Sequence, residues 1–166
     1  MTADEIYFRA RLMLDGLTPI DSDCGKLCGA VCCQGNANEG MLLFPHEQAA
    51  DEFTVRACKS GELLVCDGHC NREMRPLACI VFPLVPILVG DRIKVAVNAY
   101  AFRVCPLAKA GSRIKYNIDF VRAVRRVGRL LCSNDECREF LRQMTDEQKA
   151  ASSLLPDGQI IISGRK

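Results

Sequence analysis

Residues 87–97 read ILVGDRIKVAV, and this stretch decides the fold class. Two apolar runs, 87–89 and 92–97, flank the pair Gly90-Asp91. A glycine in the first position of a two-residue loop between such runs is typical of a type II′ hairpin turn. The second run has the alternation of a half-buried strand, with Ile93, Val95 and Val97 on one face and Arg92, Lys94 and Ala96 on the other. The stretch therefore predicts a short antiparallel hairpin.

Helical patterns surround this hairpin. Apolar residues at helical spacing predict long helices over Ala3–Leu17, His46–Cys58 and Asn117–Cys132. Capping-box patterns at Ser133/Glu136 and Thr145/Gln148 predict two further short helices. The other expected elements are an irregular loop or broken helix over 21–40, a short strand at Leu63–Val65, and a strand or loose tail over 158–166.

Together these elements predict an α+β fold, with helices packed around a short β-hairpin. A chain of 166 residues fits one domain, 1–166, with a cysteine-rich core over 21–106 and a helical C-terminal part over 117–152. The hydrophobic share of 49% and the charged share of 25% are those of a globular protein.

Charge and hydropathy argue against two classes of partner. The net charge of +2 gives no global attraction to nucleic acid or to a membrane. The longest apolar run, 77–89, contains Pro83 and Pro86 and is too short to span a bilayer. We therefore expect neither a membrane nor a nucleic acid as a partner, and the sequence names no protein partner.

The eleven cysteines are the outstanding feature of the composition. The N-terminus is acidic and has no secretory signal pattern, so we expect a cytoplasmic protein whose thiols stay reduced. An odd number cannot pair completely within one chain. In that setting, clustered cysteines are typical of metal ligands.

Eight of the cysteines fall into clusters. The first cluster is C-x3-C-x3-C-C, and the second is C-x3-C-x8-C, followed by a cysteine before Pro106. Eight thiols suffice for two tetrahedral four-thiolate sites, or for one cluster with thiols to spare. Because neighbours in an extended segment point to opposite sides, Cys32 and Cys33 either serve two adjacent sites, or one of them is a ligand and the other lies in the core. The predicted metal ligands are Cys24, Cys28, Cys32, Cys33, Cys66, Cys70, Cys79 and Cys105.

The remaining cysteines, Cys58, Cys132 and Cys137, stand alone, and we expect them to be core or surface thiols. His69, between Cys66 and Cys70, could replace one thiol as a ligand.

The clusters resemble a known family. The segment 24–33, the stretch CDGHCNREMRPLACIVFP over 66–83, and Cys105-Pro106 are similar to the YkgJ-type cysteine-cluster family. Both gaps in the first cluster have three residues here, where that family's usual opening is CxxCxxCC. The resemblance covers about residues 21–106 and implies a domain that chelates zinc or iron, without implying a reaction.

A four-thiolate zinc site carries a formal charge of −2 and needs donors or cations beside it. Arg75 is fixed by Pro76 and lies four residues before Cys79. It is the best candidate for a side chain that donates to the metal-bound thiolates and offsets their charge.

The sequence thus predicts a metal-binding protein with zinc as its cofactor, in a structural or metal-handling role. The alternative is iron, or an iron–sulfur cluster with a redox or accessory enzymatic role, because thiolates suit either metal. No hydrolase, nucleotide-binding or zinc-protease motif is present, so we predict no catalytic residue.

One further pattern lies on the helix predicted over 117–132. Four arginines recur there at helical spacing on one face: Arg122, Arg125, Arg126 and Arg129. This face either contacts an anion or is a plain solvated surface. We favour the solvated surface, because no aromatic residues interleave with the arginines.

Overall fold

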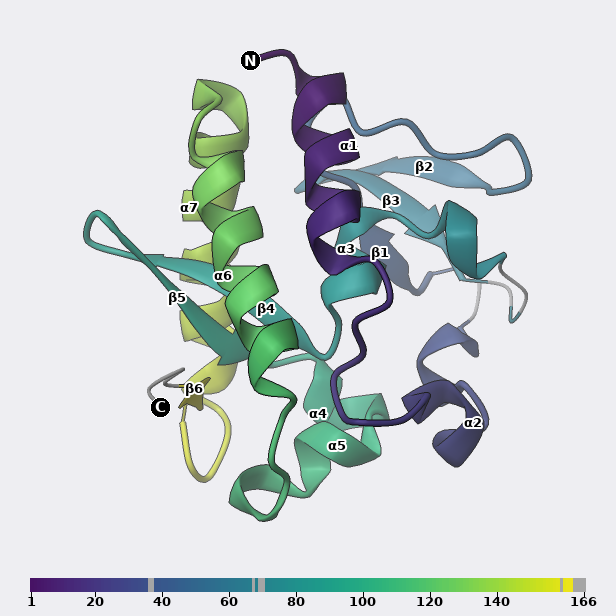
Figure 1. Cartoon of the computed structure of the whole chain (residues 1–166), viewed down its shortest axis with the longest axis vertical. Coiled ribbons are helices and arrows are strands. Elements are labelled where there is room, and N and C mark those ends of the chain that lie inside the picture. Colours follow the sequence, from purple (N-terminus) through teal and green to yellow (C-terminus); the bar gives the residue numbers. More distant parts are fainter. Residues whose placement is uncertain (36–37, 67, 69–70, 159, 163–166) are drawn as a thin grey trace.

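The computed structural model describes residues 1–35, 38–66, 68, 71–158 and 160–162. It is a single-domain α+β fold with two small antiparallel sheets, which confirms the predicted fold class (Figure 1). The α-helices described are α1 (Ala3–Leu14), α2 (Cys24–Cys28), α3 (Leu77–Val81), α4 (Ala101–Val104), α5 (Pro106–Lys109), α6 (Ile118–Leu131) and α7 (Asp135–Ser152). Three short 3₁₀ helices are η1 (Val31–Cys33), η2 (Arg72–Met74) and η3 (Gly111–Arg113).

The predicted hairpin forms β4 (Leu84–Val89) and β5 (Arg92–Val97). Val89 pairs with Arg92 across the turn, and Gly90 has a φ of +58°, as the first residue of a type II′ turn requires. β6 (Ile161–Ile162) adds to the other side of β5, so the sheet order is β4-β5-β6. Strand β4 begins before the predicted position and includes Pro86, which is tolerated because β4 is an edge strand.

Both faces of the hairpin are covered. Helix α6 packs so closely that a Cβ on Gly128 would come within 2.7 Å of side-chain atoms of Pro86 and Ile93. On the opposite face, the buried side chains Val85, Ile87 and Ala96 pack against Met144 of α7. This explains why Ala96, expected on the polar face of its strand, is buried.

The first and sixth helices carry most of the remaining core. They lie side by side (Figure 1) and bury Ile6, Ala10, Phe120, Val124 and Leu131 in one apolar cluster. Helix α1 begins at a capping box between Thr2 and Glu5 and ends three residues before the predicted Leu17. Helix α6 begins after Asn117, whose side chain caps it, within a residue of each predicted end.

The helix predicted over His46–Cys58 is wrong. Residues 55–58 form β2 (Val55–Cys58), which pairs with β3 (Gly61–Val65), and β1 (Gly40–Leu42) completes a sheet of order β1-β3-β2. His46 has a φ of +63°, which no helix contains, and the strand partner lies just beyond a two-residue turn. The pairing of residues 55–58 with β3 therefore determines their conformation, rather than the local helical spacing of their apolar residues.

The two predicted C-terminal helices are one continuous helix, α7. Its N-cap is Asn134 rather than Ser133, whose hydroxyl instead donates to the carbonyl of Leu130. Thr145 lies inside the helix, where its hydroxyl donates to the carbonyl of Leu141 and accepts from the backbone N–H of Leu88. The apparent cap at Thr145 is thus a link between α7 and the edge of β4.

In the described ranges, no helix combines the length and the apolar character needed to cross a bilayer.

Candidate metal centre

The first cysteine cluster forms a broken helix, as expected for 21–40. Asp23 caps α2 by accepting from the N–H of Gly25, and one helical turn then carries Cys24 and Cys28 on the same side. Gly29 ends α2 with a φ of +65°, and Ala30 follows with a φ of +52°. These two left-handed residues reverse the chain into η1, which brings Cys32 and Cys33 back beside the helix.

The second cluster approaches the first through β1 and β3. The backbone N–H of Cys66 donates to the carbonyl of Glu39 at 3.1 Å, next to the Gly40–Val65 pair of the sheet. Gly35, two residues after Cys33, lies so close that an added Cβ would meet the Cys66 carbonyl oxygen at 2.8 Å. A side chain at position 35 would therefore hold the two clusters apart.

The last two cysteines come from short helices. Cys79 lies on α3, which begins after Pro76. Cys105 ends α4 and precedes Pro106 at the first position of α5, and it is buried. The backbone of Cys105 is extended at this junction between the two helices.

Seven predicted ligands line two neighbouring cavities. The larger cavity, of about 690 Å³, is lined by Cys24, Cys28, Cys32, Cys79 and Cys105. The smaller, of about 40 Å³, is lined by Cys32, Cys33, Cys66 and Cys79. Cys32 and Cys79 line both cavities, and so do Arg75 and Phe82. The eighth predicted ligand, Cys70, and the alternative ligand His69 fall outside the described residues.

Lining a common cavity is a looser arrangement than coordination. Among the residues that the structure describes, no three Cys, His, Asp or Glu side chains are already grouped as a metal-holding set. The donor chemistry nevertheless fits a soft metal. Among the described residues around the larger cavity, five are cysteines and two, Asp15 and Glu73, carry carboxylates. Thiol-rich donor sets favour zinc or iron–sulfur clusters over magnesium or calcium.

Arg75, predicted to support the candidate ligands, lies beside Cys33. It borders both cavities, and its Nη2 donates to the sulfur of Cys33 at 3.6 Å. Its carbonyl accepts from Arg11 of α1 at 2.6 Å, which ties this segment to the helical core. The thiol hydrogen bond from Cys33 lowers the pKa of Cys32 below its ordinary value, and the positive charge of Arg75 adds to that effect against the opposing effect of burial.

The three isolated cysteines lie away from these cavities. Cys58 is exposed at the end of β2. Cys137 is buried, 3.4 Å from the Tyr7 hydroxyl, and burial raises the pKa of its thiol. Burial also raises the pKa of Cys132, against the opposing charge of Arg138.

Two residues beside the candidate ligands were not among the predicted site residues. Phe82 lines both cavities, and Gly35 permits the two clusters to approach. Phe82 stands three residues after Cys79, and Gly35 two after Cys33, but neither residue type signals metal binding by itself.

No protein-family model, curated protein or solved structure matches this chain. The resemblance to the YkgJ-type cysteine-cluster family therefore stays a prediction based on the cysteine motif.

Proposed function

We propose that this protein binds metal through its clustered cysteine thiolates, with zinc as the resident ion and a structural or metal-handling role. The observation that carries the proposal is the convergence of separate segments. Seven cysteines from α2, η1, the end of β3, α3 and the α4–α5 junction line two cavities with shared walls. If these cysteines were only small buried core residues, there would be no reason for them to gather around the same two cavities.

The proposed ligands are Cys24, Cys28, Cys32, Cys33, Cys66, Cys70, Cys79 and Cys105, with Arg75 as the supporting donor. Bound zinc would neutralise the thiolates and fix the segments that carry them. Arg75 would offset the remaining negative charge from the side of Cys33. Because both cavities share Cys32 and Cys79, two ions in this region would lie close together. We assign no reaction to the site, and we place the protein in the reducing cytoplasm.

The alternative occupant is iron, alone or as an iron–sulfur cluster, since four thiolates suit a cluster as well as zinc. Under this alternative the protein has a redox or accessory enzymatic role. The same cysteines would serve, so the metal has to be decided by analysis.

The experiment is elemental analysis of protein purified without air, together with its absorbance spectrum and a native titration of its thiols. Zinc at about two ions per chain in a colourless protein is the expected result, because eight thiols fill two four-thiolate sites. A brown protein that absorbs near 400 nm would show that the bound group is an iron–sulfur cluster and not zinc. A folded, metal-free protein with all eleven thiols freely titratable would contradict the proposal.

A further inference from the structure

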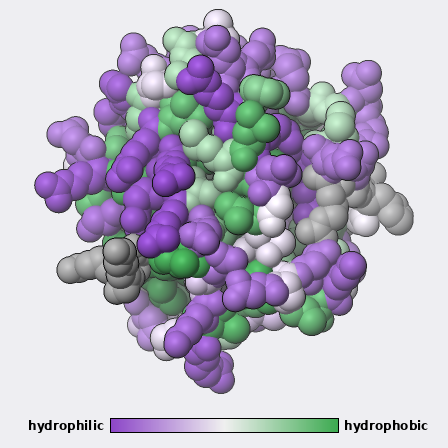
Figure 2. Space-filling model, viewed as in Figure 1, coloured by the Kyte–Doolittle hydropathy of each residue, from purple (hydrophilic) through white to green (hydrophobic). Residues whose placement is uncertain are grey.

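A third cavity, away from the cysteine clusters, is bordered by cations. It has a volume of about 890 Å³ and lies where the β4–β5 turn, the last turns of α6 and the first turns of α7 meet. The cations on its lining are Arg92 and Lys94 of β5, Arg125 and Arg129 of α6, and Arg138 and Arg142 of α7. In Figure 2, hydrophilic residues dominate the side of the molecule where α6 and the hairpin lie.

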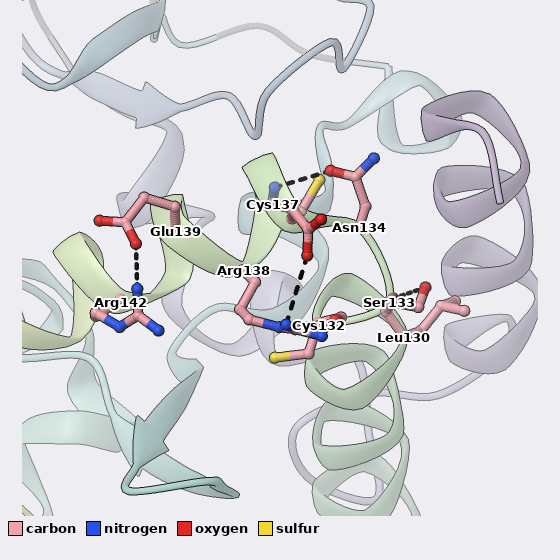
Figure 3. Close-up of polar contacts among 9 residues, drawn as sticks. Leu130, Cys132, Ser133, Asn134, Cys137, Arg138, Glu139 and Arg142 are labelled. Carbon is pink, nitrogen blue, oxygen red and sulfur yellow. Dashed lines mark hydrogen bonds and ion pairs between the residues drawn. The ribbon is translucent and has the colours of Figure 1, made fainter.

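These cations are poorly compensated. Among the residues that the structure describes, Asp91 is the only acidic one on the lining. Arg138 forms an ion pair with Asp135 at 3.5 Å, and Arg142 pairs with Glu139 (Figure 3). Within the described part of the chain, no carboxylate lies within 4.0 Å of Arg92, Lys94, Arg125 or Arg129. The chain as a whole is nearly balanced, so this is a local concentration of positive charge.

Specific contacts join the three elements that contribute cations to the cavity. Gly128, between Arg125 and Arg129 in sequence, permits the contact of α6 with the hairpin. The Thr145 hydroxyl fixes α7 to β4 through the N–H of Leu88 at 2.9 Å. Arg138 reaches from α7 to the end of α6, where its Nε donates to the Cys132 carbonyl at 3.0 Å (Figure 3). These contacts link the three elements that supply the cations of the cavity.

Helix chemistry accounts for only part of this charge. Arg129 lies in the last turn of α6, and Arg138 donates to the carbonyl of Cys132 at the C-terminal end of that helix, so both benefit from the helix dipole. That explanation does not cover Arg92 and Lys94, which come from a strand, or Arg125, which lies a turn earlier. Like charges brought together without a counter-charge repel one another, and a bound anion would remove that repulsion.

We propose that this cavity binds a small molecule that carries several phosphate groups. Five of its six cations are arginines, whose planar forks match the oxygens of a phosphate. Its volume falls in the range of small-molecule sites, and Leu88, Ile93 and Ile162 add an apolar surface for the rest of the ligand. Arg122 and Arg126 of the same helix face do not line the cavity, so the cations surround a concavity rather than track an extended nucleic-acid backbone.

The test is isothermal titration calorimetry of the full chain with inorganic tripolyphosphate, at low and at physiological salt. R125Q/R129Q should weaken binding by at least about tenfold, because each variant side chain loses charge-assisted hydrogen bonds. The matched control is R122Q/R126Q, which removes the same charge from the same helix outside the cavity. It should change binding by less than about twofold, through long-range charge that salt screens.

A second pair of substitutions, on a different element, distinguishes a loss of binding from misfolding of the R125Q/R129Q variant. R92Q/K94Q alters two exposed positions of β5 and should weaken tripolyphosphate binding as R125Q/R129Q does. Absence of binding to the wild-type chain would overturn the proposal, and so would equal weakening by R122Q/R126Q. Citrate binding as tightly as tripolyphosphate would overturn the phosphate class. Duplex DNA or RNA that competes, with equal dependence on all four arginines of α6, would make the face a nucleic-acid surface and overturn the small-molecule assignment.

Discussion

The cysteine region and the helical half of this protein achieve order in different ways. Helix α6 buries seven of its fourteen residues against α1 and the β4–β5 hairpin. By contrast, α2 and η1, both within the described part of the chain, bury none of their residues, and all four residues of β2 are exposed. The first cluster, over residues 24–33, therefore lies where the apolar core does not reach, whereas Cys105 of the second group is part of that core. A short segment without buried apolar side chains needs another source of stability, and metal ligation is the source that we propose for it.

Metal removal should have the largest effect, and it should affect the cysteine region but not α6. A chelator applied under reducing conditions should strip backbone protection from residues 24–33 while α6 stays protected, because structural zinc contributes about 10–16 kcal/mol of apparent binding free energy. Hydrogen exchange measured before and after chelation gives the result segment by segment. Equal loss of protection in α6, or unchanged exchange in residues 24–33, would show that the two regions do not differ as we argue.

The converse change is made in the apolar core. Phe120 has no exposed surface, so Phe120→Ala should lower the free energy of unfolding by about 3–5 kcal/mol through lost burial and a cavity. Urea unfolding measures that loss, and elemental analysis of the folded variant should give the wild-type metal content. A variant that is folded but loses its metal would tie the two regions together more closely than we propose.

A smaller effect is expected where α6 touches the hairpin. Gly128→Ala should destabilise the protein. The added methyl group would meet Pro86 and Ile93, which should cost about 1–3 kcal/mol, and the better helix propensity of alanine should offset roughly 1 kcal/mol of that cost. Thermal unfolding provides the measurement, and Arg126→Ala is the control at an exposed position of the same helix. A stabilised Gly128→Ala variant would mean that the contact has room to relax.

The smallest effect should follow from the arginine face itself. Replacing Arg122 and Arg126 by Gln should change the free energy of unfolding by less than about 0.5 kcal/mol per site, since surface charges contribute little. Arg122 pairs with the exposed Asp119 at 3.2 Å. A fall of several degrees in Tm would show that these arginines support the fold after all.

Local signals carried the successful sequence predictions. The β4–β5 hairpin depends on Gly90 and on alternation over a few residues, and α6 depends on one apolar stripe and the cap at Asn117. The failures came from non-local pairing. Residues 55–58 satisfy a helical pattern as well as a strand pattern, and only the pairing with β3 selects the strand. Likewise, the sequence around Thr145 resembles a helix cap, but in the structure Thr145 lies inside α7 and its hydroxyl binds the edge of β4.

The candidate sites show the same division. Spacing in the sequence identified the cysteines, but their arrangement around two cavities depends on the β1–β3 pairing and on Gly35. The basic cavity could not be foreseen from the arginines of α6 alone. Its other cations come from β5 and α7, which reach it through the turn at Gly90 and the packing of α7 on β4.

The central claim is that the clustered cysteines hold metal and the isolated ones do not. The most direct measurement is the metal content of single Cys→Ser variants purified without air. Cys79→Ser removes a thiol that borders both cavities and should lower the metal content and expose the fold to chelators. Cys132→Ser and Cys58→Ser should keep the wild-type metal content. Metal loss in Cys132→Ser equal to that in Cys79→Ser, or wild-type metal content in Cys79→Ser, would contradict the account.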